Sequence, residues 1–259
     1  MKGLTVLLID ALNLIRRVHA AQGGKEDGQS IESAIDSCVH SLKRALGECG
    51  PTHVVCVFEG QGPSVRHEIY SGYKAGRQPM PEDLQKNLVR FKESFLQAGV
   101  KSVEMDAVEA DDIIASLAQR IALHKGNVII LSTDKIFLQL LSPHIKVRDH
   151  FNKAFLDDEF VVKKFGVKPE QFVDLLSLAG DSTNTIPGVP GVGLKTAARL
   201  LEEHITLEDV LENAAAIRGK TGQAIAGHAQ DALLARELIR LRDDIELGEN
   251  LQSFRYHQQ

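Results

Sequence analysis

The sequence predicts an α/β protein in which a doubly wound, mostly parallel sheet is followed by an all-helical region. Three runs, Leu4–Ile9, His53–Phe58 and Asn127–Ser132, are largely apolar on both faces, as buried parallel strands are. Helical patterns alternate with these strands, which is typical of a parallel sheet covered by helices. From about residue 160 only helical patterns remain. We therefore expect an α/β core over residues 1–157 and a helical region over residues 158–259.

The remaining elements follow from periodicity. Ser30–Leu46 and Asp83–Ala98 place apolar residues on one face and predict amphipathic helices, while Ile145–Arg148 predicts a short strand near the sheet edge. In the second region the helical patterns cover Glu159–Phe165, Pro169–Ala179, Leu194–Glu203, Leu207–Ala215 and Ala229–Leu241.

The composition is that of a globular protein. The 259 residues are 43% hydrophobic and 25% charged. The net charge of −5 argues mildly against nucleic-acid binding, and it counts for less if carboxylates are gathered at a metal site. Cys38, Cys49 and Cys56 lack metal-ligand spacing and are interpreted as reduced thiols. The first apolar run is too short for a signal peptide or a membrane span, so we expect a cytoplasmic protein with no membrane contact. We also expect a monomer with no evident protein partner.

Acidic residues follow the predicted strands. Asp10, Glu59 and Asp134 stand at or just after strand ends, where open α/β sheets place their sites. Alone, Asp10 is equally well explained as a helix cap. Glu109–Asp112 places three carboxylates at one helix N-terminus, where one would suffice as a cap and where like charges repel. This cluster therefore favours a divalent cation over simple capping.

Residues 61–83 form a long polar connection rich in glycine, arginine and histidine, and they include Lys74 and Arg77. A connection of this length inside a compact domain is usually functional or disordered. It is either a flexible basic arch or a solvated surface loop.

The stretch Gly180–Leu201 combines a run of glycine and proline with a helix that begins at Leu194. The run predicts consecutive tight turns that leave backbone N–H groups bare at the helix N-terminus, a suitable place for phosphate. Lys195 and Arg199 add positive charge one turn apart. A plain helix–helix connection is the alternative, but the order of residues favours binding to a phosphate backbone. It resembles the helix–hairpin–helix and helix–three-turn–helix modules that hold duplex DNA by its backbone.

Five motifs occur in order: Asp10, Tyr-Lys-Ala-Gly-Arg at 73–77, Glu-Ala-Asp-Asp at 109–112, Ser-Thr-Asp-Lys at 132–135 and Gly-Asp-Ser-x-x-x-Ile-Pro-Gly-Val at 180–189. As a set spanning essentially the whole chain, they resemble the structure-specific 5′-nuclease (flap endonuclease) superfamily, most closely the bacterial exonuclease IX type. The resemblance implies a PIN-like nuclease core and a helix–three-turn–helix at about 170–203, which binds branched or 5′-flapped double-stranded DNA.

The resemblance also implies roles for individual residues. A first Mg²⁺ site matches Asp10, Glu59, Glu109 and Asp111, and a second matches Asp112, Asp134 and Asp181. Lys74 and Arg77 would stabilise charge on the phosphoryl group, with Asp10 and Asp111 as catalytic metal ligands. Backbone carbonyls around Leu178, Ala179, Pro187, Val189 and Val192 would hold K⁺. Duplex DNA would be gripped by Gly191, Val192, Gly193, Leu194, Lys195, Thr196 and Arg199.

Two departures weaken the second metal site, because Ile136 and Asn184 stand where relatives carry carboxylates. An isoleucine cannot replace a hard oxygen ligand. We expect one competent Mg²⁺ site and a weak second one, and hence a Mg²⁺-dependent 5′ flap endonuclease. The alternatives are a DNA-junction binding protein whose nuclease activity has largely lapsed and, less favoured, an RNase that shares the α/β fold.

Overall fold

The computed structural model describes residues 3–23 and 28–257. They form two compact units, of which the first contains Met1–Gly62, Pro79–Phe155 and Arg242–Gln259, and the second contains Pro63–Gln78 and Leu156–Leu241. A single boundary at 157/158 stays a prediction. In the structure, residues 63–78 fold with the helical unit and residues 242–257 fold with the sheet unit.

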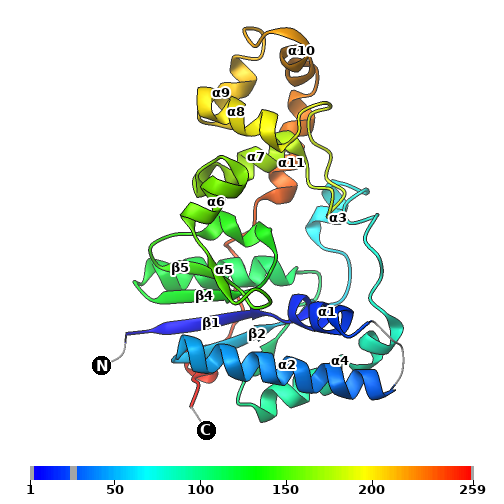
Figure 1. The fold of residues 1–259 in the computed structure, drawn as a ribbon, viewed down its shortest axis with the longest axis vertical. Helices are drawn as coiled ribbons and strands as arrows, with labels where there is room; N and C mark the ends of the chain where they lie inside the picture. The colour runs from blue at the N-terminus through cyan, green and yellow to red at the C-terminus, as the bar shows by residue number, and fades with distance from the viewer. Residues whose placement is uncertain (1–2, 24–27, 258–259) are drawn as a thin grey trace. The chain divides into compact units, whose positions relative to one another are not determined.

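One sheet organises the first unit (Figure 1). Within the described residues its six strands lie in the order β3-β2-β1-β4-β5-β6. Their bounds are β1 Thr5–Asp10, β2 His53–Val57, β3 Lys101–Val103, β4 Asn127–Leu131, β5 Ile145–Asp149 and β6 Ala154–Leu156. β1 is parallel to both of its neighbours, β2 and β4. The predicted doubly wound, mostly parallel sheet is confirmed.

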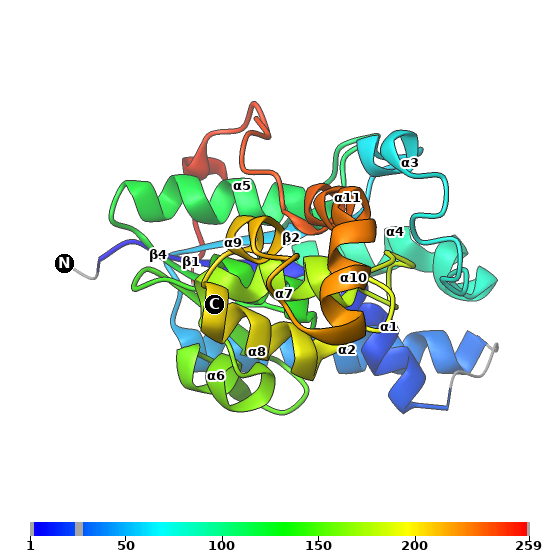
Figure 2. The same ribbon diagram turned by 90° about the horizontal axis from the view of Figure 1, so that it is seen from above.

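Helices cover both faces of this sheet, as Figure 2 shows for α2 and α5. The helical elements of the first unit are α1 Ala11–Ala21, α2 Gly28–Cys49, α4 Glu82–Gln97, α5 Ala110–Leu123, and the 3₁₀ helices η1 Lys135–Leu140 and η3 Leu251–Phe254. Because side chains alternate along a strand, Leu7 and Ile9 face the core shared with α1, α2 and α4. The sequence patterns did not predict α1, β3 or β6.

The C-terminal residues return along α5 to the sheet. Ser116 of α5 donates its hydroxyl to the Arg242 carbonyl (3.2 Å) and accepts from the Ile245 backbone N–H (3.0 Å). Farther on, the Tyr256 N–H donates to the Thr52 carbonyl beside β2 (2.9 Å). These bonds make residues 242–256 part of the α/β core.

The second unit is helical, as predicted. Its elements are α3 Val65–Ile69, α6 Asp158–Phe165, η2 Pro169–Gln171, α7 Phe172–Ala179, α8 Leu194–His204, α9 Leu207–Glu212, α10 Gly219–Gly227 and α11 Ala229–Ile239. α7 is the central helix, because it packs against both α8 and α11 and buries Phe172, Leu175 and Leu178. Helix α10 was not predicted.

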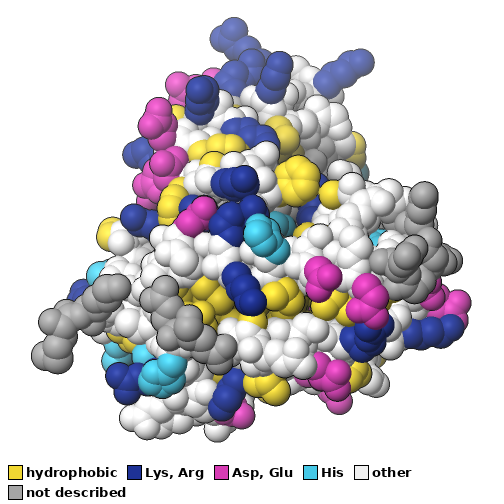
Figure 3. Space-filling view, turned by 60° about the horizontal axis from the view of Figure 1, so that its bottom comes forward, with side chains coloured by type: hydrophobic (Ala, Val, Ile, Leu, Met, Phe, Trp, Pro, Cys, Tyr) yellow, Lys and Arg dark blue, Asp and Glu magenta, His cyan; other side chains and the backbone are white. Residues whose placement is uncertain are grey.

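The face drawn in Figure 3 carries side chains of both signs of charge. This mixture agrees with a net charge of only −5. Cys38, Cys49 and Cys56 all carry free thiols. In the part of the chain that the structure describes, no helix is long and apolar enough to cross a membrane.

Candidate active site

Asp10 marks the point at which the strand order reverses. It is the last residue of β1, and the chain continues to β2 on one side of β1 and to β4 on the other. In open α/β sheets, ligands bind outside the carboxyl ends of the strands at such a switch point. The register pairs Asp10 with Val57 and Ile9 with Leu131, so Glu59 and Asp134 follow strands that end at the same edge.

The Asp10 carboxylate is buried, with 7% of the residue exposed. It caps α1 by accepting the Asn13 N–H (3.1 Å), and it accepts the Ser132 hydroxyl (2.8 Å). Burial raises the pKa of Asp10 to about 7, because it penalises the charged form. The two hydrogen bonds oppose this rise, while the negative charges of Asp134 and Glu59 add to it. A positive charge at this position would favour the ionised carboxylate.

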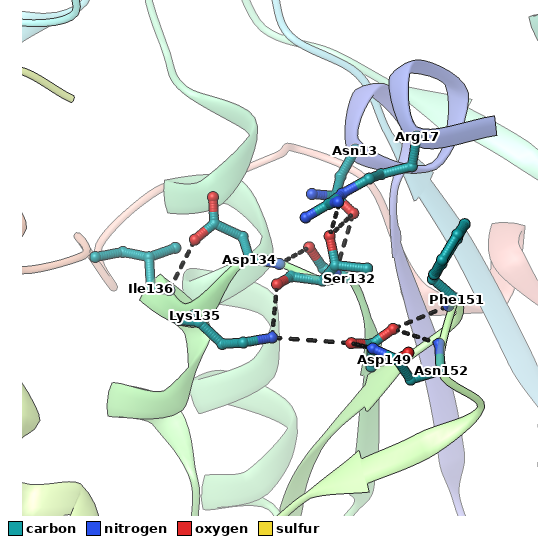
Figure 4. A network of polar contacts seen from close by, with 10 residues as sticks. Asn13, Arg17, Ser132, Asp134, Lys135, Ile136, Asp149, Phe151 and Asn152 are labelled. Atoms are coloured by element: carbon teal, nitrogen blue, oxygen red, sulfur yellow. Dashed lines mark hydrogen bonds and ion pairs between the residues drawn. The ribbon is translucent and has the colours of Figure 1, made fainter. Parts of the chain in front are cut away.

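Ser132 links Asp10 to Asp134. Its hydroxyl donates to Asp10 and accepts the Asp134 backbone N–H (3.0 Å). Asp134 in turn caps η1 by accepting the N–H of Ile136 (2.9 Å), as Figure 4 shows. The residue that replaces a carboxylate in the family pattern therefore contributes its backbone to the orientation of Asp134.

The N-terminus of α5 supplies the other predicted carboxylates. Glu59 accepts the Ala110 N–H (3.1 Å), so it satisfies one of the free donors at this helix end. Glu109 stands at the N-cap position and is 3% exposed. Asp111 and Asp112 lie in the first turn, where the helix dipole favours negative charge. Asp112 is also buried, and it accepts the Arg242 N–H (2.9 Å).

The structure does not bring these carboxylates together around one point. Within residues 3–23 and 28–257, no three His, Cys, Asp or Glu side chains are placed to hold one metal ion together. Asp10, Glu59 and Asp134 are close enough to raise the pKa of Asp10, and Asp112 is used to hold the C-terminal segment. Their assignment as metal ligands stays a prediction.

The segment that carries Lys74 and Arg77 belongs to the second unit. Arg66 anchors it: this residue is 5% exposed and donates to the carbonyls of Leu238 and Arg240 at the end of α11, both at 2.8 Å. Lys74 adopts a φ of 56°, and its Nζ lies 5.1 Å from the ring centre of the buried Tyr73. The segment thus contains a short helix and a buried anchor, in contrast to a fully solvated loop.

The loop after α7 holds this segment by its backbone. The Lys74 N–H donates to the Asn184 carbonyl (2.8 Å), and the Gly76 N–H donates to the Thr185 hydroxyl (3.1 Å). Within the loop, the Asn184 side-chain amide donates to Asp181 (2.7 Å), whose other oxygen accepts the Thr183 N–H (2.9 Å). Asn184 therefore supplies an amide donor to one Asp181 oxygen, at a position where the resemblance led us to expect a second carboxylate.

The predicted turns between α7 and α8 require glycine. Gly180 has a φ of 80°, and a Cβ at Gly188 would lie 2.3 Å from the Gly180 nitrogen and 2.6 Å from the Leu178 oxygen. The backbones around 178–180 and 186–189 are therefore in direct contact, which brings several of the carbonyls predicted to hold K⁺ into one small region. Of these, the Leu178 and Val189 carbonyls already accept backbone hydrogen bonds.

Helix α8 presents its N-terminus to solvent. Gly193 is its N-cap and supplies no side-chain cap, and no acidic residue lies in the first turn. Gly191, Gly193, Leu194, Lys195 and Arg199 are exposed, Thr196 is half-buried and Val192 is buried. This end of the helix offers backbone donors and two cationic side chains on its accessible surface.

The sequence matches two family models that together cover nearly all of it. Residues 5–166 match the 5′-3′ exonuclease N-terminal resolvase-like domain, and residues 167–259 match the 5′-3′ exonuclease C-terminal SAM fold. The chain belongs to the 5′-3′ exonuclease family. It is 40% identical to flap endonuclease Xni of Cronobacter sakazakii, covering 97% of this chain and 98% of that protein. It is 43% identical to flap endonuclease Xni of Aliivibrio fischeri, covering 97% and 96%.

Solved structures of low sequence identity share the fold of this family member. T5 5′-exonuclease with bound divalent metal ions (zinc) matches with a TM-score of 0.77 at 20% identity, covering 91% of this chain and 89% of that chain. The catalytic core of Rad2 in complex with DNA substrate matches with a TM-score of 0.58 at 15% identity, covering 95% of this chain and 80% of that chain. The predicted membership of the flap endonuclease superfamily is confirmed.

Several residues that position the site were not singled out from the sequence. Ser132 was quoted within a motif, but its bridging hydroxyl depends on the parallel pairing of β1 and β4. Arg66 sits in a basic stretch whose pattern does not distinguish a buried arginine from a solvated one. Arg242 holds Asp112 through its backbone, which no side-chain pattern reveals.

Proposed function

We propose that this chain is a structure-specific 5′ flap endonuclease that hydrolyses phosphodiester bonds in branched DNA with the help of a divalent metal ion. One observation carries the proposal: Asp10 ends β1 at the switch point of a parallel sheet, and its pKa is raised by burial and by the negative charges of Asp134 and Glu59. The 40–43% identical relatives that match over nearly their whole length are flap endonucleases.

Asp10, Glu109 and Asp111 are the residues that we propose to hold Mg²⁺, with Glu59 beside them. Carboxylate oxygens are the ligands that Mg²⁺ prefers, and this ion is usually bound by one or two carboxylates, with waters and substrate phosphates completing its shell. A loosely gathered acidic set therefore suits it. T5 5′-exonuclease, which shares the fold, has been solved with divalent metal ions. A bound ion would activate a water molecule and polarise the scissile phosphate.

The second metal site is proposed to be weak. Of its three remaining carboxylates, Asp112 accepts a backbone N–H from Arg242, Asp134 caps η1, and Asp181 is held by Asn184. Each of these carboxylates accepts at least one hydrogen bond from the protein itself. We infer that a second ion binds there only when a substrate phosphate supplies further oxygen ligands.

Lys74 and Arg77 are proposed to stabilise negative charge that develops on the phosphoryl group. The two backbone bonds from residues 74 and 76 to the 184–185 loop support this role, because they fix the main chain from which both side chains project. Arg77 is exposed and Lys74 is half-buried, so both can reach a polyanionic substrate.

The turns and the N-terminus of α8 are proposed to grip duplex DNA by its backbone. Gly191–Thr196 would offer N–H groups to phosphate, with Lys195 and Arg199 adding charge. A K⁺ ion held by the carbonyls of Leu178, Ala179, Pro187, Val189 and Val192 would bridge to a DNA phosphate. The close backbone approach at Gly180 and Gly188 supports this site. A monomeric state and a cytoplasmic location stay predictions.

A DNA-junction binding protein with lapsed nuclease activity is the second candidate, and the Asn184–Asp181 bond favours it. The deciding experiment maps the products from a labelled 5′-flap duplex with Mg²⁺, with Mn²⁺ and with a chelator. We expect metal-dependent cleavage near the flap base. Tight flap binding without cleavage under any of these conditions would favour the second candidate.

A further inference from the structure

Lys74 and Arg77 lie in a segment of consecutive turns that is anchored within the second unit. The Tyr73 side chain is 5% exposed, and the buried Arg66 is bound to carbonyls at the end of α11. The Arg77 N–H donates to the Lys74 carbonyl (2.9 Å). Because of this bond, a shift of the main chain at residue 74 is passed on to residue 77.

The loop of residues 181–186, which follows α7, meets these turns through a side chain as well as through its backbone. The Gly76 N–H donates to the Thr185 hydroxyl (3.1 Å), next to the bond from the Lys74 N–H to the Asn184 carbonyl (2.8 Å). A Cβ at Gly76 would lie only 3.2 Å from the same hydroxyl. Figure 1 shows this loop beside the segment that follows α3. The hydroxyl of Thr185 is therefore one of two acceptors that hold the main chain of residues 74–76.

Both partners have an unusual backbone at this contact. Lys74 has a φ of 56° and Thr185 a φ of 58°, in the left-handed region that glycine favours. For the β-branched Thr185 this conformation is a clear outlier. Such conformations are costly, persist only where the surrounding structure fixes them, and cluster at active sites and ligand clamps. Glycine would build the turn without this cost, but it would offer no hydroxyl to Gly76.

The loop that carries Thr185 is closely connected to the turns before α8. Asp181 and Ile186 exchange two backbone hydrogen bonds, both at 2.9 Å, and Ile186 is 4% exposed. The close backbone contact between Gly180 and Gly188 fixes the residues that follow. The turns that carry Lys74 and the turns proposed to grip duplex DNA are therefore parts of one compact unit.

We propose that Thr185 is a positioning residue for flap cleavage, which acts on Lys74 and Arg77 by holding the Gly76 N–H. This role rests on the proposed function of those two side chains. The bond fixes the main chain between them, so their charges are held at a set place relative to the turns that grip the duplex. A misplacement of about 1 Å can lower a reaction rate by about a hundredfold. Duplex affinity depends on other residues, so the loss of this bond affects the rate far more than binding.

The test replaces the hydroxyl alone. Thr185→Val keeps the size and the β-branching of the side chain, and we expect the single-turnover rate of flap cleavage with Mg²⁺ to fall about tenfold. Flap affinity in a chelating buffer should change by less than about twofold, because the bond acts on the reaction and not on binding. Thr185→Ser, which keeps the hydroxyl, should cleave at the wild-type rate. The matched control Thr183→Val removes the hydroxyl of an exposed threonine in the same loop and should leave the rate unchanged.

Two further measurements distinguish positioning from general structural damage. In a Lys74→Ala, Arg77→Ala background, Thr185→Val should lower the rate by less than about twofold, because the groups on which it acts are absent. Amide hydrogen exchange needs no activity at all. The amides of residues 74 and 76 should exchange faster in Thr185→Val than in Thr183→Val, whereas the amides of α8 should stay equally protected in both.

An unchanged cleavage rate in folded Thr185→Val would overturn the proposal, and so would an equal loss in the wild-type and the Lys74→Ala, Arg77→Ala backgrounds. Unchanged exchange at residues 74 and 76 would overturn it even in a protein that cleaves flaps at the wild-type rate. If the wild type itself does not cleave, the proposed function fails and the catalytic role of Thr185 fails with it. The cleavage rate of the wild type therefore separates the two failures.

Discussion

Two acidic regions of this molecule differ in the groups that surround their carboxylates. Around Asp10, a buried carboxylate lies near Asp134 and Glu59, and its pKa is raised to about 7. Around Asp181, the neighbouring position carries Asn184, whose amide donates to the carboxylate at 2.7 Å. In the first region an added cation would favour the ionised carboxylate, whereas in the second region hydrogen bonds already stabilise the carboxylate. The comparison leads us to propose that this protein holds one divalent ion at the first region and lacks a competent second site.

The largest effect is expected at the first region. Asp111→Ala should reduce Mg²⁺-dependent flap cleavage by more than about a hundredfold, because a metal ligand supplies several kcal/mol of transition-state stabilisation. Flap binding should be retained. The matched control is Asp83→Ala, which removes an acidic residue from the first turn of α4. Wild-type cleavage by the purified Asp111 variant would remove this carboxylate from the mechanism.

Asp10→Asn should stabilise the protein in a chelating buffer at pH 7.5 by about 2–4 kcal/mol, since each pKa unit corresponds to about 1.4 kcal/mol. The folded pKa of Asp10 lies above its unfolded value. Its contribution to stability is therefore present below about pH 4 and is lost as the pH rises through about 7. Urea denaturation at pH 5 and 7.5 measures this, and the gain should shrink at the lower pH. An Asn variant that is less stable at pH 7.5 would contradict the assigned burial penalty.

Asn184→Asp should destabilise the metal-free protein by about 1–3 kcal/mol, because two carboxylates would then face each other where an amide now donates. Mg²⁺ should restore the loss. Asn184→Ala serves as the control, since it removes the same hydrogen bond without adding charge and should not respond to Mg²⁺. Thermal melts with and without Mg²⁺ distinguish the two variants, and an equal response of both would count against a latent metal site.

Lys195→Ala should have the smallest effect. The variant should bind duplex DNA more weakly by a similar factor for every sequence, and the slope of log affinity against log salt should fall by about one. Lys101→Ala, an exposed lysine on the edge strand β3, is the control. A loss of binding that depends on sequence would argue against a phosphate contact.

Features that depend on local sequence could be predicted, whereas contacts that depend on chain pairing could not. Buried strands and long amphipathic helices were predicted because hydrophobic periodicity determines them locally. Helix α1 was missed although Ala11, Leu14 and Ile15 follow helical spacing and could have predicted it, and β3 and β6 were missed because three residues carry little periodicity. The acidic residues could be named from their motifs. Their hydrogen bonds to Ser132, Arg242 and Asn184 depend on chain pairing and on backbone groups, which leave no sequence pattern.

The most direct test of the central claim counts bound Mg²⁺ by calorimetry in the wild type and in the Ile136→Asp, Asn184→Asp double variant. The account predicts one ion per wild-type chain and two per chain in the double variant, which restores both of the family's missing carboxylates. Faster flap cleavage should accompany the second ion. Two ions in the wild type, or a single ion in the double variant, would contradict the claim that this chain has one competent metal site and lacks a competent second one.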